Sequence, residues 1–162
     1  MKNRRGDGKN RPSEVRAAIR YTREAEQALH RLGRLHEEYA AAILDIAVEK
    51  GLLKEVRLHE PFSEEDKAGV DITITTCDGK KHDLQIKSSA ADAHDFSRKK
   101  HHRTIPVLIL NLYSKPASVI HQLRCIFPWL SKFKLEHQEI SDLYDRLGKS
   151  RGGAYSIRAK KS

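Results

Sequence analysis

The first third of the chain repeats its apolar residues at helical spacing. From residue 29 onward they return every three or four positions, which places them on one side of a helix: Leu29, Leu32, Leu35, Tyr39, Ile43, Ile46 and Ala47. The Ser13 hydroxyl can cap the start of such a helix, and Gly51 suits its end. Gly33 is a point at which the helix could bend or split. The pattern predicts one long helix between residues 13 and 50.

The following segment changes to the period of β-strands. Residues 52–59 alternate apolar with charged side chains, and residues 69–76 are rich in β-branched side chains. A polar loop, residues 60–68, separates these two predicted strands. Residues 77–80 are Cys-Asp-Gly-Lys, and Asp-Gly supplies the positive backbone angles that a hairpin turn requires. Residues 81–89 are then the returning strand of a hairpin.

The second half of the chain predicts one buried strand and two helices. Residues 104–113 form a nearly unbroken apolar run, which is typical of a strand buried on both faces at the centre of a sheet. The preceding stretch, residues 92–103, is polar and basic and suits a loop with a short helix. Residues 117–130 and 134–147 have helical spacing. This order of elements predicts the α/β fold class, with a mixed β-sheet flanked by helices.

The length of 162 residues suits a single domain. We expect residues 13–150 to form it, between a flexible basic arm at residues 1–12 and a basic tail at residues 151–162. Cys77 and Cys125 lack CxxC spacing and indicate reduced thiols in a cytoplasmic protein. No apolar run reaches the roughly 20 residues of a membrane span, and no apolar segment of a secretory signal follows the basic N-terminus.

The charge of the chain indicates a polyanionic partner. Lysine and arginine number 31 against 22 acidic residues, which gives a net charge of +9 and a pI near 9.6. Nucleic acid is the commonest partner of this kind, and an acidic membrane surface is the alternative. A basic protein can also simply be soluble, so charge alone does not decide the function.

The predicted hairpin brings together residues that can cleave phosphodiesters. Asp71 lies on its first strand, and Gln85 and Lys87 share one face of its second strand with Asp83. Carboxylate and amide oxygens are the ligands that Mg²⁺ prefers, and Mn²⁺ accepts the same set. Such a metal polarises a phosphate and activates water. The lysine can orient that water or neutralise the charge that develops on the phosphate.

At these residues the chain resembles the PD-(D/E)xK nuclease superfamily. Gly-Val-Asp at residues 69–71 is followed fourteen residues later by Gln-Ile-Lys at residues 85–87, and Gly-Arg-Leu-His-Glu-Glu at residues 33–38 lies on the helix upstream. The resemblance implies a restriction-endonuclease-like fold and a Mg²⁺-dependent endonuclease acting on DNA rather than RNA. It implies that Asp71, Gln85 and one glutamate hold the metal, with Lys87 as a catalytic residue. Members often act as homodimers.

The upstream glutamate could be Glu37 or Glu38, and either could also be a solvent-facing helix residue. Glu37 is favoured by its position four residues after Gly33. The usual Glu of the motif is Gln85 here, a variant known from the Mrr group of the superfamily. An amide oxygen brings no charge, so metal affinity should be weaker unless Asp83 or the upstream glutamate supplies it.

Three alternatives remain open. The hairpin could be an ordinary one with a solvated polar face. The chain could be a catalytically inactive nuclease fold that binds DNA or RNA. It could also be a basic protein associated with RNA.

Several cations near the motif are candidate contacts to nucleic acid. The segment after the second hairpin strand supplies Arg98, Lys99, Lys100 and Arg103, with His101 and His102 between them, and Ser88 follows Lys87 directly. Arg4 and Arg5 lie on the basic arm, which has no motif that could recognise bases. The alternative is a solvated loop and a serine that only ends a strand.

Overall fold

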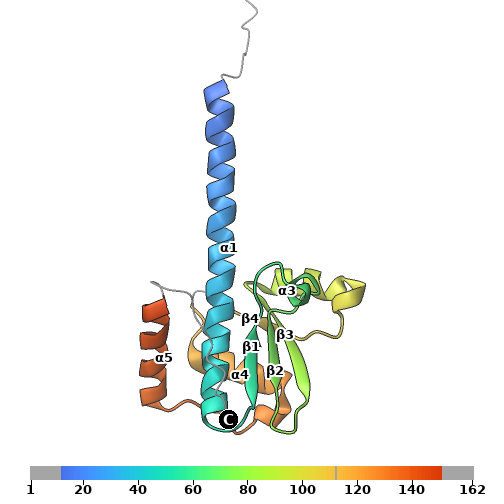
Figure 1. The fold of residues 1–162 in the computed structure, drawn as a ribbon, viewed down its shortest axis with the longest axis vertical. Helices are drawn as coiled ribbons and strands as arrows, with labels where there is room; N and C mark the ends of the chain where they lie inside the picture. Colours follow the sequence, from blue (N-terminus) through green and yellow to red (C-terminus); the bar gives the residue numbers. More distant parts are fainter. Residues whose placement is uncertain (1–11, 112, 151–162) are drawn as a thin grey trace, which may run out of the picture. The chain divides into compact units, whose positions relative to one another are not determined.

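The computed structural model describes residues 12–111 and 113–150. The elements along the chain are α1 (Pro12–Glu49), β1 (Glu55–Leu58), α2 (Glu64–Lys67), β2 (Ile72–Thr75), β3 (Lys81–Lys87), α3 (Ala90–Arg98), the 3-10 helix η1 (Lys100–His102), β4 (Val107–Ile109), α4 (Pro116–Ile126), the 3-10 helix η2 (Pro128–Leu130) and α5 (His137–Ser150) (Figure 1). Nearly all of the predicted basic arm, with Arg4 and Arg5, and the predicted tail lie outside the described residues.

The predicted long helix is confirmed as α1, which begins at Pro12, one residue earlier than expected. Proline fits the first turn of a helix because its missing N–H would have no partner there. The helix runs without a break through Gly33, so a split at this glycine is wrong. Its contacts nevertheless change at this glycine, since the chain separates into one unit of residues 1–32 and another of residues 33–162.

The apolar stripe of α1 is buried only in its second half. Leu29 is 69% exposed and Leu35 is 46% exposed, whereas Ile43, Leu44 and Ala47 are fully buried. The first residues of the stripe are therefore exposed, and only its second half reaches a core. The helix reaches the core of the second unit through small alanines and branched side chains, which let a helix approach a sheet closely.

The end of α1 has the glycine cap that the sequence predicted. Gly51 has a φ of 71°, in the left-handed region that favours glycine. Its N–H donates to Val48 O at 2.9 Å, and the Leu52 N–H donates to Ala47 O at 2.9 Å. This pair of bonds is a Schellman motif, and it turns the chain from α1 toward β1.

The four strands form one mixed sheet in the order β1-β2-β3-β4. Strand β2 is antiparallel to both β1 and β3, and β4 is parallel to β3. The predicted hairpin of β2 and β3 is confirmed, and Gly79 in its turn has a φ of 84°. A mixed sheet with helices confirms the α/β class.

The position of β4 corrects one prediction. The apolar run of residues 104–113 was expected at the centre of the sheet, but β4 has only three residues and lies at the edge. Leu108 is fully buried, whereas Val107 and Ile109 are half-buried. The Gln122 side chain of α4 accepts from Ile109 N at 3.2 Å and donates to Ile109 O at 3.0 Å. An amide side chain thus pairs with the edge strand where a central strand would have a neighbour.

One hydrophobic core joins α1, the four strands, α4, η2 and α5 within the second unit. The two predicted C-terminal helices are confirmed as α4 and α5. The expected polar loop at residues 60–68 contains the short helix α2, which the Ser63 hydroxyl caps by accepting from Asp66 N. Cys77 and Cys125 are free and exposed. In the described part of the chain no helix is long and apolar enough to cross a membrane.

Candidate active site

The hairpin brings Asp71 and Gln85 into direct contact. Ile72 pairs with Leu84, and the Asp71 N–H donates to Leu84 O at 3.1 Å, so the ladder continues one residue before β2 begins. The Gln85 Nε2 donates to Asp71 Oδ2 at 2.5 Å, and the Ile86 N–H donates to the same oxygen at 2.7 Å. Asp71 and Gln85 are each only 5% exposed. The predicted neighbours are confirmed, and both side chains are buried rather than on a solvated face.

Burial raises the pKa of the Asp71 carboxyl above its ordinary value. Three groups oppose that shift: the Ile86 N–H, the positive charge of Lys87 and the Gln85 amide, in decreasing order. The effect of Lys87 shows that its ammonium lies within electrostatic range of Asp71. A nearby cation would stabilise the charged form of the carboxyl further.

Glu37 of α1 is electrostatically coupled to the same carboxyl. Burial and, second, the negative charge of Asp71 raise the pKa of Glu37 to about 7, although Arg34 opposes the shift. Glu38 lies on the neighbouring side of the helix, with its Oε1 3.5 Å from Arg34 Nε. Of the two candidate glutamates, Glu37 is therefore the one that lies within electrostatic range of Asp71. It is also the one that the spacing from Gly33 favoured.

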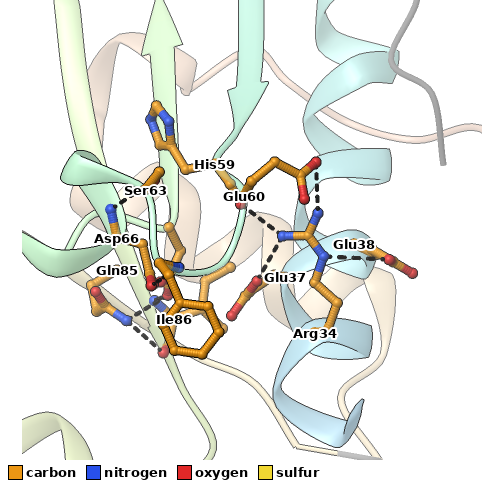
Figure 2. A network of polar contacts seen from close by, with 11 residues as sticks. Arg34, Glu37, Glu38, His59, Glu60, Ser63, Asp66, Gln85 and Ile86 are labelled. Carbon is orange, nitrogen blue, oxygen red and sulfur yellow. Dashed lines mark hydrogen bonds and ion pairs between the residues drawn. The ribbon is translucent and has the colours of Figure 1, made fainter. Parts of the chain in front are cut away.

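Arg34, in the interior of α1, binds the chain at the end of β1, and Figure 2 shows its guanidinium between three carboxylates. Its Nη1 donates to His59 O at 2.7 Å and to Glu37 Oε2 at 3.2 Å, and its Nη2 lies 3.6 Å from Glu60 Oε1. The residue was not predicted from the sequence. The signal was visible, because an arginine three and four residues before two glutamates is a helical ion-pair spacing.

Asp66 of α2 is a third acidic residue near Asp71 and Glu37. Unlike those two, it was not predicted from the sequence. Its negative charge contributes to the raised pKa of both Glu37 and Asp71, so it lies within electrostatic range of both. Its Oδ2 accepts from the Phe62 N–H at 2.7 Å. The acidic composition of residues 60–68 was the available signal, but only the fold places this loop beside the hairpin.

Lys87 lies at the end of β3 and is half-buried. Its ammonium is over the ring of Phe96 in α3, with Nζ 5.1 Å from the ring centroid. Asp83, two positions before Gln85, is exposed and accepts from Thr73 Oγ1 at 2.9 Å. It is therefore not part of the contact between Asp71 and Gln85, and Glu37 is better placed to add charge there.

The described residues contain no group of three or more His, Cys, Asp or Glu side chains that could hold a metal. An amide oxygen falls outside that set, and here it matters. Gln85 Oε1 is buried and has no hydrogen-bond partner among the described residues. An unsatisfied buried acceptor costs about 1–3 kcal/mol. Like the carboxylates of Glu37 and Asp71, the Gln85 amide offers a hard oxygen, the kind of donor that Mg²⁺ and Mn²⁺ prefer.

The predicted contacts to nucleic acid lie on α3 and η1. Arg98, Lys99 and Arg103 are exposed, and none of them pairs with a carboxylate in the described part of the chain. The side chain of Lys100, like Arg4 and Arg5, lies outside the description. The Ser88 hydroxyl donates to Asp92 Oδ2 at 3.2 Å. A contact from Ser88 to phosphate would therefore have to replace the bond to Asp92.

Comparisons with known proteins add no relative. A scan against family models, a search of curated proteins and a search of solved structures each return no match. The resemblance to the nuclease superfamily therefore rests on the residues themselves and on where the structure places them.

Proposed function

We propose that the chain is a Mg²⁺-dependent endonuclease that hydrolyses phosphodiester bonds in DNA, on a restriction-endonuclease-like fold of the PD-(D/E)xK type. One observation carries the proposal. The β2–β3 hairpin brings Asp71 and Gln85 into contact, and Glu37 is electrostatically coupled to Asp71. Lys87 lies two residues after Gln85 on β3, on the same face of the strand. Charge, oxygen donors and an ammonium thus meet at one end of the sheet.

Glu37, Asp71 and Gln85 Oε1 are the donors that would hold the ion. When bound, Mg²⁺ polarises the scissile phosphate and lowers the pKa of a water ligand. The Lys87 ammonium, near Asp71, would stabilise negative charge that develops on the phosphate oxygens. Arg34 would keep Glu37 directed at the site by binding it to the end of β1.

The Gln85 amide has to turn over for this role. Its NH₂ group faces Asp71 in the structure, and its oxygen is the atom without a partner. The two ends of an amide have nearly the same shape, so the turn needs little space. It would give up the two hydrogen bonds of the NH₂ group, to Asp71 Oδ2 and to Ile86 O, in exchange for a shared cation, and it would bring an orphaned oxygen into use.

The nucleic-acid side of the proposal rests on charge. Arg98, Lys99 and Arg103 follow Lys87 closely along the chain, on the helical segment that supplies Phe96 to the site. Exposed cations without carboxylate partners can bind phosphates and release counterions. The net charge of +9 is consistent with a polyanionic substrate.

The test is cleavage of a supercoiled plasmid and of a labelled duplex, with Mg²⁺ and with EDTA. Asp71→Asn and Lys87→Met should each reduce cleavage at least a hundredfold, since each removes a group from the reacting centre. Asp83→Asn, on the same strand but outside the contact, and Glu38→Gln should retain parental rates. Equal cleavage by Asp71→Asn, Lys87→Met and the parent would show that the assigned site is wrong.

A nucleic-acid-binding module without catalysis is the second candidate. The neutral Gln85, already bonded to Asp71, favours it, because the pair is satisfied on that side without a cation. This candidate predicts salt-sensitive DNA binding of equal strength in Asp71→Asn and parent, with no metal-dependent cleavage by either.

A further inference from the structure

We propose that Phe96 is a positioning residue for Lys87, holding its ammonium at the end of β3 with the face of an aromatic ring. This inference rests on the proposed function for its catalytic part, but the positioning itself can be measured without activity. The Lys87 Nζ lies over the Phe96 ring, 5.1 Å from its centroid. A cation at that distance is attracted by the negative charge of the ring face.

The ring is fixed from two further sides. Phe96 is 6% exposed and stacks on the His102 imidazole, with centroids 4.2 Å apart and an interplanar angle of 15°. Its edge packs against Gly69, where an added Cβ would lie 2.8 Å from Cε2 and 3.0 Å from Cζ. Gly69 also has a φ of 83°, so both space and backbone require glycine there. Packing contacts therefore hold the ring under Lys87 on two further sides.

The ring contacts the Lys87 ammonium without forming an ion pair with it. No ion pair within the described residues includes Lys87, and Asp71 Oδ2 already accepts from Gln85 and Ile86. A carboxylate partner would bind the N–H groups of the ammonium, whereas a ring face attracts the cation without accepting strong hydrogen bonds. Phe96 thus keeps the three N–H donors available for a water molecule or a phosphate oxygen.

The first test is the ring-current effect on Lys87. With lysine labelled by ¹³C at the ε position, the Lys87 ε protons should resonate upfield of the other lysines and show nuclear Overhauser effects to the Phe96 ring. Phe96→Leu should move that signal into the bulk of the lysine resonances. Phe133→Leu, a matched loss of a buried ring in the core, should leave it in place.

A parent protein whose Lys87 signal shows neither the upfield shift nor the contact to the ring would overturn the positioning. This outcome does not depend on whether Phe96→Leu folds. The measurement also needs no cleavage activity, so it distinguishes a failure of the positioning from a failure of the proposed function.

The second test separates positioning from folding by rate. In Phe96→Leu the single-turnover rate at saturating DNA should fall about two- to thirtyfold, the range expected for a lost cation–ring attraction, with the KM for DNA within about twofold of the parent. 3,5-Difluorophenylalanine at position 96 keeps the ring but weakens its negative face, so it should give an intermediate rate. Adding Phe96→Leu to Lys87→Met should cause no further loss. A parental rate in the folded leucine variant, or full additivity with Lys87→Met, would contradict the role.

Discussion

At the scale of single residues, the carboxyl of Glu37 is the group whose ionisation the structure perturbs most clearly toward neutral pH. Burial and Asp71 favour its protonated form, and Arg34 favours the charged one. A cation placed between Glu37 and Asp71 would reverse the balance, because it stabilises both carboxylates. Protonation and metal binding therefore compete at this site.

The first prediction concerns pH. The folded pKa of Glu37, about 7, is above its ordinary value of 4.5, so the folded state binds this proton more tightly than the unfolded one. The resulting stability is fully present below pH 4.5 and is lost as the pH rises through 7. Without metal, the free energy of unfolding should fall by about 2 kcal/mol on this account, the side chain being partly exposed. Urea unfolding across this range measures it.

Glu37→Gln should remove that part of the pH dependence, because its amide is neutral throughout. Glu38→Gln, one residue further along the helix, is the matched control and should keep it. Mg²⁺ should restore stability to the parent above pH 7 but not to Glu37→Gln. An unchanged pH dependence in Glu37→Gln would mean that this carboxyl is not buried against Asp71.

The second prediction concerns the amide at position 85. Gln85→Glu adds a negative charge beside Asp71, so Mg²⁺ should bind on the order of tenfold more tightly. In EDTA the same variant should be less stable than the parent by about 1–3 kcal/mol, since it places two carboxylates together in a buried position. Isothermal titration and thermal unfolding measure the two effects. An unchanged Mg²⁺ affinity in Gln85→Glu would separate Gln85 from the metal site, and an unchanged stability in EDTA would contradict its burial beside Asp71.

At the scale of elements, the hairpin and the edge of the sheet differ in how far local sequence determines them. The turn of the hairpin depends on Asp78 and Gly79, and the register that follows brings Asp71 opposite Gln85. The edge position of β4 depends instead on a contact with α4, thirteen residues further along the chain. The alternation of side chains along a strand and the residues of a turn can be read from neighbouring positions in the sequence. Which strand or helix lies beside an apolar strand depends on the whole fold.

The third prediction tests that edge. Gln122→Ala removes both hydrogen bonds between the α4 side chain and the Ile109 backbone and should reduce the free energy of unfolding by about 1–2 kcal/mol. Gln138→Ala, whose exposed side chain bonds Asp142 within α5, is the control and should cost under about 0.5 kcal/mol. Urea denaturation of both variants gives the comparison. Equal effects would mean that Gln122 does not cover the edge of β4.

The sequence was sufficient for the parts of the site that lie on one hairpin. Asp71, Gln85 and Lys87 are related by strand period and a short turn, so their neighbourhood follows from local rules. Arg34 and Asp66 were missed because their relevance depends on how α1 and α2 pack on the hairpin. The burial of Asp71 and Gln85 was missed for the same reason, since polar side chains on a hairpin are usually solvated.

At the scale of the whole molecule, charge is distributed unevenly about the site. The loop with α2 is acidic, whereas residues 98–103, at the end of α3 and in η1, are basic. A nucleic acid approaching the site would therefore be attracted from the side of α3 and repelled from the side of α2. The proposal thus predicts that nucleic acid binds on the α3 side of the site, and is not attracted equally to all of the protein surface.

The fourth prediction tests this direction. Replacing Arg98, Lys99 and Arg103 together by glutamine should reduce the slope of log K against log salt for duplex DNA by up to about 3, because each lost phosphate contact removes about 0.9. The control replaces three exposed lysines with the same change in net charge: Lys54, Lys81 and Lys132. Lys54 and Lys81 lie at the opposite ends of β1 and β3 from the site. Equal slopes for the two triple variants would show that α3 and η1 do not form the binding face.

The most direct measurement is the anomalous scattering of Mn²⁺ in crystals grown near pH 8, where Glu37 is ionised. The account predicts one peak at the site end of the hairpin, with oxygens of Asp71 and Gln85 at about 2.1–2.2 Å and Glu37 bound directly or through a water molecule. The Gln85 oxygen should then face Asp71 in place of its NH₂ group, and the Lys87 ammonium should remain over Phe96. A saturating Mn²⁺ soak that leaves the bond from Gln85 Nε2 to Asp71 intact, with no peak beside it, would contradict the account.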